Sequence, residues 1–220
     1  MSRDLSHLRE SYARAGLRRR DLAPDPLGQF ERWWDEWLAT EPYDPAACVL
    51  ATADAQGRPS ARFLLCRAFD ASGFVVYTNK RSRKGQDLAD NPAGSLLFGW
   101  LELSRQVRIE GPVTEVDDVT ADAYWAERPR GHQIGGWASA QSKPVADRAE
   151  LDAIQTEVEV RFGTADTDAP IPRPPHWGGY RIGLERVEFW QGQPDRLHDR
   201  FEYRRTPDGD GSWELRRLAP

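Results

Sequence analysis

The chain has 220 residues, a formal net charge of −5, 30% charged residues and 39% hydrophobic residues. Nine tryptophans exclude a typical disordered chain, and the negative charge argues against a nucleic-acid partner, which requires a positive surface. No apolar run approaches the roughly 18 residues of a membrane span, and two cysteines are too few for a disulfide framework, so we expect a cytoplasmic protein with Cys48 and Cys66 buried.

The N-terminal part of the sequence predicts two helices. The first is a short polar helix over residues 4–14, which contains no apolar core of a secretory signal and precedes a basic, solvated turn at 18–20. The second begins at Asp25-Pro26, an N-cap followed by proline in the first turn, and ends at Glu41-Pro42. Its apolar residues recur at helical spacing and are predicted to face the core: Phe30, Trp33, Trp34, Trp37 and Leu38.

A block of short strands follows, separated by residues that favour turns. Strands are predicted at 47–53, 61–67, 73–79, 95–101 and 106–113, with a turn at 54–57 and a helix at 82–91. Such an antiparallel meander of short strands is typical of a small closed barrel.

The C-terminal half returns to helices and then to strands. Helices are predicted at 117–128 and 145–162, a loop at 163–176, strands at 180–184, 186–191, 201–205 and 213–218, and a turn at 207–209. The whole pattern indicates an α+β fold, an antiparallel barrel flanked by helices, with residues 25–220 as one domain after an N-terminal segment, 1–24.

Common catalytic motifs are missing from the sequence. It contains no GxGxxG, no P-loop and no GxSxG motif, and its four histidines and two cysteines lack the spacing of zinc ligands. We therefore predict no metal site.

Three groups of cationic residues remain as candidates. The first includes Arg62, Arg67 and the Arg83-Lys84 pair, which begins a short helix and could hold a phosphate, or could equally be a solvated helix start. On a regular strand Arg62 and Arg67 would point to opposite faces.

The second group, Tyr124, Arg128 and Arg130, has its tyrosine and Arg128 on one helical face, where they could hold phosphate oxygens or form a structural stack. The third group, Arg196, His198 and Arg200, would alternate along one face if their segment is extended. Three such groups on one face indicate an anionic ligand rather than core.

At these residues the sequence resembles the pyridoxine/pyridoxamine 5′-phosphate oxidase family. The resemblance covers nearly the whole chain and includes the segments GLRRRDLAPDPLGQFERW, RFLLCR, YTNKRSRKGQDLADNP, RQVRIEGPV and WGGYRIGLERVEFWQGQPDRLHDRF. It implies an FMN-binding split barrel that forms a homodimer, with two active sites at the subunit interface.

The resemblance also implies which residues bind FMN. One subunit would contribute Arg62, Phe63, Leu64, Leu65, Cys66, Arg67, Tyr77, Thr78, Arg83, Lys84 and Gln106. The other subunit would contribute Gln141, Ser142, Trp190 and Arg200.

The implied substrate residues fall into three sets. Arg67, Tyr124, Arg128 and His132 would hold the substrate phosphate, and Arg196, Leu197 and His198 would lie over the substrate ring, with Arg196 and His198 catalytic. The segment Arg9, Glu10, Ser11 and Tyr12 resembles a lid that folds over bound substrate.

Two positions depart from the family pattern. Arg67 stands where a lysine is usual, so a planar guanidinium replaces a compact ammonium group. His132 stands where a serine is common, and an imidazole would make phosphate affinity depend on pH. Both departures concern the substrate preference rather than the fold.

The implied reaction is hydride transfer from the substrate C4′ carbon to flavin N5, followed by reoxidation by dioxygen to give hydrogen peroxide, so that pyridoxamine or pyridoxine 5′-phosphate becomes pyridoxal 5′-phosphate. Two alternatives remain open: an oxidase of the same fold acting on another substrate, as in phenazine biosynthesis, and a non-catalytic carrier of flavin or pyridoxal phosphate.

Overall fold

The computed structural model describes residues 16–164, 166–207 and 211–220. Its helices are α1 (Pro26–Leu38), α2 (Arg83–Asp90), α3 (Asp118–Ala126), α4 (Arg130–Ala138) and α5 (Arg148–Phe162). Its strands are β1 (Ala47–Ala53), β2 (Pro59–Asp70), β3 (Gly73–Asn79), β4 (Ala93–Trp100), β5 (Arg105–Glu115), β6 (Trp177–Ile182), β7 (Arg186–Gln191), β8 (Asp199–Arg205) and β9 (Trp213–Leu218). Short 3-10 turns occupy Arg19–Asp21, Leu101–Leu103 and Pro194–Arg196.

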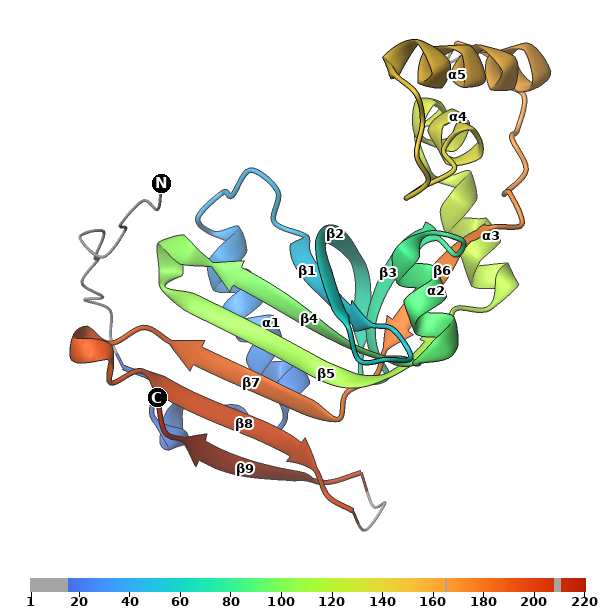
Figure 1. Cartoon of the computed structure of the whole chain (residues 1–220). Coiled ribbons are helices and arrows are strands. Elements are labelled where there is room, and N and C mark those ends of the chain that lie inside the picture. Colours follow the sequence, from blue (N-terminus) through green and yellow to red (C-terminus); the bar gives the residue numbers. More distant parts are fainter. Residues whose placement is uncertain (1–15, 165, 208–210) are drawn as a thin grey trace, which may run out of the picture.

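Six antiparallel strands close into a barrel in the order β4-β1-β2-β3-β6-β5, with β5 pairing back to β4 (Figure 1). Strand β5 is shared between two neighbours: residues 113–115 pair with β6, whereas residues 105–110 pair with β7. Strands β7, β8 and β9 thereby continue the sheet beyond the barrel. The predicted antiparallel split barrel with flanking helices is confirmed.

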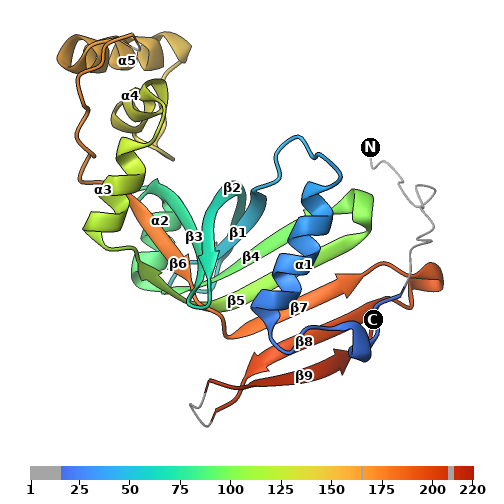
Figure 2. The same cartoon turned by 180° about the vertical axis from the view of Figure 1, so that it is seen from behind.

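Helix α1 crosses one face of the sheet and supplies the centre of the core (Figure 2). Asp25 caps it by accepting the Gly28 N–H at 2.9 Å. Phe30, 1% exposed, contacts Phe74 and Phe98 edge-on at centroid distances of 4.7 and 5.1 Å. Edge-to-face packing of this kind adds to the free energy gained from burying the rings.

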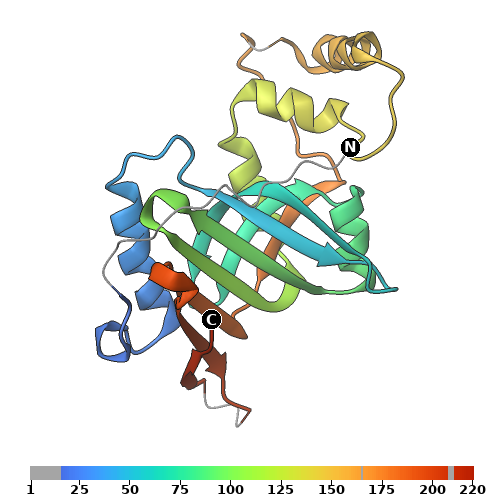
Figure 3. The ribbon, with the colours of Figure 1, turned by 60° about the vertical axis from the view of Figure 1, so that its left-hand side comes forward.

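Helices α3, α4 and α5 project from one end of the barrel, and the β8–β9 hairpin extends at the opposite end (Figures 1 and 3). Helix α5 has no buried residue. Arg130 connects the start of α4 to the segment after α5, since its Nε donates to the Thr164 carbonyl at 2.6 Å. No helix of the described residues is long and apolar enough to cross a membrane.

Most predicted elements are present, with three differences. Leu38, predicted to face the core, is 42% exposed because α1 ends there. Helix α4 was not predicted, and Pro129, interpreted as a helix end, is its N-cap residue. Strand β2 is longer than predicted and carries a bulge between Cys66 and Ala68, so regular alternation ends at Arg67.

Other predictions concern segments that are only partly described. The predicted helix at 4–14 lies outside the described residues, as do parts of the turn at 207–209. Residues 18–20 are exposed in a short turn, as predicted. Both cysteines are buried free thiols, and burial raises the pKa of Cys48 to about 12 and that of Cys66 to about 11.

Candidate functional site

A buried lysine held by neutral groups marks the first part of the site. Lys84 lies in the first turn of α2 and is 5% exposed. Its Nζ donates to three neutral oxygens: Thr78 Oγ1 at 3.0 Å, Ser82 Oγ at 3.0 Å and Gln141 Oε1 at 2.7 Å. Burial and the nearby Arg62 lower the pKa of Lys84 to about 8. A buried ammonium held by neutral acceptors favours the binding of an anion.

Arg62 lies beside Lys84 and is fixed by polar contacts from the barrel. Its Nη1 donates to Thr52 Oγ1 at 2.8 Å, and its Nη2 donates to Ser60 Oγ at 2.7 Å. The carboxylate of Asp87 lies 3.9 Å away and also accepts from Thr52 Oγ1 at 2.6 Å. Burial lowers the pKa of Arg62. The pair Arg62 and Lys84 therefore carries more positive charge than Asp87 offsets.

A second cationic group lies around Arg128. Its guanidinium lies 4.7 Å above the Trp177 ring, and its Nη2 donates to the His132 carbonyl at 3.1 Å. Its Nε is buried without a hydrogen-bond partner among the described residues. Burial, with Arg67 nearby, lowers the pKa of Arg128, while Tyr124 opposes this. An unpaired buried N–H is costly unless a ligand accepts from it.

Aromatic rings hold this second group in place. Tyr77 and Tyr124 stack at 4.0 Å between centroids, and Tyr77 also stacks on Trp177 at 5.3 Å. Tyr124 and Arg128 thus both belong to a stack on the Trp177 ring, as the structural interpretation predicts, and the phosphate-binding role of the pair stays a prediction.

One cavity of about 360 Å³ is lined by Arg128 and by Thr78 and Gln141, the two residues that accept hydrogen bonds from the Lys84 ammonium. It is lined by residues predicted for FMN and for the substrate phosphate: Leu64, Tyr77, Thr78, Gln141, Arg128 and His132. Its walls come from β2, β3, α4 and the segment after α4.

Three further predicted FMN residues lie together elsewhere on the chain. Gln106, Trp190 and Arg200 are register neighbours across β5, β7 and β8 and line a separate cavity of about 320 Å³. Within one chain, Gln106 lies with Trp190 and Arg200, whereas Gln141 contacts Lys84. The expected division of these residues between two subunits stays a prediction. Tertiary folding decides the grouping within the chain, since β5 pairs with β7 and the segment after α4 returns to α2.

The predicted catalytic pair lies between β7 and β8. The His198 ring is 4.6 Å from the Trp190 ring, and its Nδ1 accepts from the Gln193 N–H at 3.1 Å, which leaves a proton for Nε2. Arg196 is exposed and has φ 62°, next to Asp195 at φ 55°. Consecutive non-glycine residues in the left-handed region are strained, and such strain is concentrated at functional sites.

The remaining predicted residues occupy varied environments. Arg83 and Arg67 are exposed, and Arg83 is close enough to contribute to the lowered pKa of Arg62. Phe63 and Leu197 are 78% and 70% exposed, Leu65 is half-buried and Cys66 is buried. Ser142 is exposed with φ 72°. The predicted lid, residues 9–12, lies outside the described residues.

Several residues around the site were not predicted. Thr52, Ser60 and Asp87 fix Arg62, Ser82 contacts Lys84, and Trp177 lies beneath Arg128. Arg108 and Glu188 line the second cavity. Ser60, Arg108 and Glu188 had a sequence signal, because each is two residues from a predicted FMN residue on the same strand and so shares its face.

The described residues fit FMN by charge. Its phosphate is a dianion near neutral pH, and Lys84, Arg62 and Arg83 provide three cations, which the nearby Asp87 offsets only in part. No group of histidine, cysteine and acidic side chains suited to a metal ion occurs among the described residues.

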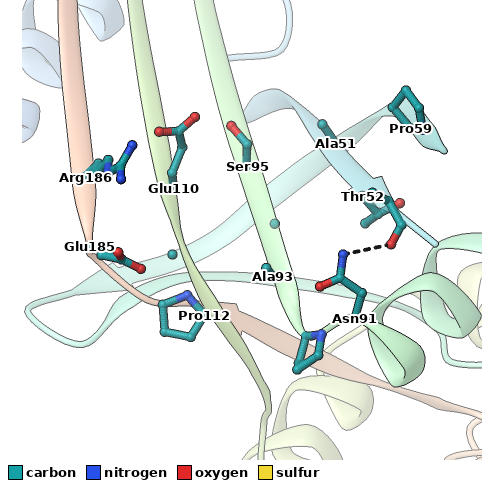
Figure 4. A pocket seen from close by; sticks show the side chains of 14 residues that line it. Ala51, Thr52, Pro59, Asn91, Ala93, Ser95, Glu110, Pro112, Glu185 and Arg186 are labelled. Carbon is teal, nitrogen blue, oxygen red and sulfur yellow. Dashed lines mark hydrogen bonds between the residues drawn. The ribbon is translucent and has the colours of Figure 1, made fainter. Parts of the chain in front are cut away.

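A larger hollow at the barrel is separate from this site. It measures about 610 Å³ and is lined mainly by β1, β4 and β5 and by turns next to them (Figure 4). Glu110, Glu185 and Arg186 lie along one side of it and Thr52 and Asn91 on the other (Figure 4). None of the predicted site residues that the structure describes lines it.

Two family descriptions match the chain. Residues 35–162 match the model described as pyridoxamine 5′-phosphate oxidase. Residues 177–220 match the model described as the pyridoxine 5′-phosphate oxidase C-terminal dimerisation region.

Individual proteins are similar over nearly the full chain. The pyridoxine/pyridoxamine 5′-phosphate oxidase 1 of Ralstonia nicotianae is 52% identical over 216 residues, covering 98% of this chain and 99% of that protein. The crystal structure of PhzG from Burkholderia lata, in complex with tetrahydrophenazine-1-carboxylic acid, aligns with a TM-score of 0.84 at 30% identity, covering 96% and 100% of the two chains. A pyridoxamine 5′-phosphate oxidase-related, FMN-binding protein from Nostoc punctiforme shares the fold, with a TM-score of 0.68 at 19% identity over 90% and 100%.

Proposed function

Because this chain belongs to the pyridoxamine 5′-phosphate oxidase family of oxidoreductases, we propose that it binds FMN and oxidises pyridoxamine or pyridoxine 5′-phosphate to pyridoxal 5′-phosphate. With the alcohol, dioxygen is reduced to hydrogen peroxide as two hydrogens leave the substrate. With the amine, water also enters and ammonia leaves. The product would supply the cell with pyridoxal phosphate.

One observation carries the proposal: the chain holds two cationic seats, of which Arg128 lines the cavity of about 360 Å³ and Lys84 contacts Thr78 and Gln141 in its wall. Lys84 and Arg62 form the first seat, and Arg128, whose Nε has no partner among the described residues, forms the second. A flavin mononucleotide and a phosphorylated substrate each bring a dianion, so two seats are needed.

The redox chemistry supplied by bound FMN is hydride acceptance from C4′ followed by electron transfer to dioxygen. The protein contributes binding and orientation, which by themselves supply a large rate factor. Arg67, Tyr124, Arg128 and His132 would hold the substrate phosphate. Arg196 and the Nε2 proton of His198 would orient the substrate ring.

We further propose that the enzyme is a homodimer with shared active sites. The cavity at Lys84 and the cavity at Arg200 share none of the described lining residues. A two-fold partner could bring its Arg200 cavity against the Lys84 cavity of the first chain, which would complete two equal sites. The match to a dimerisation region supports this arrangement.

A cytoplasmic location is part of the proposal. The two free, buried cysteines are compatible with a reducing compartment.

Anaerobic spectroscopy of the purified protein tests the main proposal. We expect flavin absorption bands that bleach on adding pyridoxamine 5′-phosphate and return on admitting air, with hydrogen peroxide formed. Unphosphorylated pyridoxamine serves as the control and should bleach them far more slowly. Flavin bands that never bleach would indicate a non-catalytic carrier, and a protein that takes up no FMN would refute the proposal.

The similarity to PhzG supports a second candidate, a flavin oxidase acting on a phenazine-type carboxylic acid. A carboxylate carries one charge and could bind at Arg128 without needing a second cation. Bleaching by a reduced phenazine carboxylic acid, with no response to pyridoxamine 5′-phosphate, would favour this candidate.

A further inference from the structure

The second cavity contains an ion-pair network centred on β7. Glu188 lies on this strand, two residues before Trp190 and directly opposite Arg108 of β5 in the strand register. Arg200 of β8 is the register neighbour of Trp190. All four side chains line the cavity of about 320 Å³, together with Gln106.

The carboxylate of Glu188 joins two arginines at once. Its Oε1 accepts from Arg200 Nε at 2.6 Å, and its Oε2 accepts from Arg108 Nη2 at 2.6 Å. The Glu188 side chain is only 8% exposed. A carboxylate buried to this extent is tolerated when both oxygens are paired, and removing its charge leaves two guanidinium groups close together.

These contacts restrict how Arg200 can face the cavity. Its Nε is bound to Glu188, and its Nη1 donates to the Ala219 carbonyl at 2.8 Å. The hydrogen bond to Glu188 raises the pKa of Arg200. With two nitrogens held by the protein, Nη2 is the group best able to donate to a ligand.

We propose that Glu188 is a positioning residue of the flavin site: its carboxylate fixes Arg200 so that Nη2 faces the flavin, and it offsets the combined charge of Arg108 and Arg200. This inference rests on the proposed FMN binding at Arg200.

The charge of Glu188 should also affect the reduction potential of the bound flavin. Glu110 also pairs with Arg108, at 3.4 Å from its Nε, so the network of two arginines and the carboxylates of Glu188 and Glu110 has no net charge. Glu188→Gln leaves a net charge of +1 beside the flavin. Added positive charge stabilises the more negative, reduced form of the ring system, so the reduction potential of the bound flavin should become more positive.

Glu188→Gln is compared with wild type in two measurements. Titration of the apoprotein with FMN, monitored by flavin fluorescence, gives the Kd, and potentiometry of the reconstituted protein gives the reduction potential. We expect the Kd for FMN to rise about tenfold, the scale expected when a hydrogen bond from a charged group is weakened, and the potential to move in the positive direction. The matched control is Glu36→Gln, which breaks another 2.6 Å glutamate–arginine pair, with Arg105 of β5, outside the cavity lining. It should change neither quantity.

A double-mutant cycle shows whether Glu188 affects FMN binding through Arg200 or through the stability of the fold. In an Arg200→Ala background, Glu188→Gln should change the Kd for FMN by less than about twofold, because the positioned group is already gone. A full tenfold effect in that background would overturn the proposal, as would a single variant with wild-type Kd and potential. Glu188→Gln keeps the side-chain volume and one acceptor oxygen. The melting temperature of this variant shows whether it is folded. A wild-type protein that binds no FMN would instead refute the proposed function.

Discussion

At the residue scale, Lys84 is the clearest case of a side chain whose surroundings imply a ligand. It is buried in the first turn of α2 among neutral acceptors, and the nearby carboxylate of Asp87 is engaged by Thr52 and Arg62. A fold has little reason to bury an ammonium in this way for stability, since its desolvation opposes folding.

The lowered pKa of Lys84 predicts a pH-dependent FMN affinity. In the free protein the ammonium loses its proton above about pH 8, whereas a bound phosphate dianion raises that pKa again. Between the two pKa values, binding requires uptake of one proton, so the Kd for FMN should rise up to about tenfold per pH unit. Fluorescence titrations from about pH 7 to about pH 9.5, a range that spans the lowered pKa, measure this.

Riboflavin, which lacks the phosphate, is the control for this titration and should show a flat Kd over the same range. A flat Kd for FMN as well would mean that Lys84 does not contact the phosphate.

Arg128 is the residue we expect to separate substrate binding from flavin binding. Arg128→Ala removes a guanidinium whose buried Nε has no partner among the described residues, and the KM for pyridoxamine 5′-phosphate should rise by about 30- to 150-fold, corresponding to about 2–3 kcal/mol for a charged hydrogen bond. The Kd for FMN should remain within about twofold of wild type.

Arg161→Ala is the matched control for Arg128→Ala. Arg161 also stacks on an aromatic ring, 4.9 Å from that of Trp137, but it lies exposed on α5. Its steady-state constants should equal those of wild type, and an equal rise in KM for both variants would contradict the assigned role of Arg128.

At the element scale, the site depends on where α2 begins relative to β3. A Cβ at Gly85 would lie 2.1 Å from the Lys80 carbonyl oxygen, so this helix can approach the preceding turn only with glycine at that position. The close approach places Lys84 next to Thr78 at the end of β3.

Gly85→Ala should therefore lower the free energy of unfolding by about 1–3 kcal/mol through steric overlap and also weaken FMN binding by displacing Lys84. Urea denaturation followed by tryptophan fluorescence checks the first effect. Gly99→Ala is the control, because a Cβ there meets nothing within 4 Å. Equal stability of the two variants would show that the turn adjusts without cost.

The predicted elements were most accurate where the local pattern was strong. The N-cap and proline that start α1 and the alternating strands of the barrel were found within a few residues. Helix α4 was missed because its segment contains Gly131, Gly135 and Gly136, which lower helix propensity. Its formation depends on contacts with α5 and with the loop that carries Ile171.

At the scale of the whole molecule, the predicted flavin and substrate residues line two separate cavities, which are the half-sites of the proposed dimer. Lys84, Arg128 and Gln141 surround one cavity or lie beside it, and Gln106, Trp190 and Arg200 surround another. This division is the basis for proposing that a second copy completes each site.

Subunit complementation tests this proposal. Lys84→Met and Arg200→Ala should each abolish most activity alone. After the two variants are mixed and allowed to exchange subunits at random, half of the dimers are mixed and each has one intact site, so about a quarter of wild-type activity should return. Native mass spectrometry of variants with tags of different mass verifies the exchange. Mixing Lys84→Met with wild-type-like Arg161→Ala is the activity control, since it should give half of wild-type activity with or without exchange. No recovery in the first mixture, despite proven exchange, would place both half-sites in one chain.

Hydrophobic periodicity, capping residues and family motifs are local properties of the chain, and they were enough to predict the strands of the barrel, the burial of α1 and the cationic residues. Which of these residues come into contact became clear only from the folded chain. The pairing of β5 with β7 placed Gln106 beside Trp190, and the return of the chain after α4 placed Gln141 against Lys84. Contacts between residues far apart in sequence depend on closure of the barrel, and no local pattern encodes it.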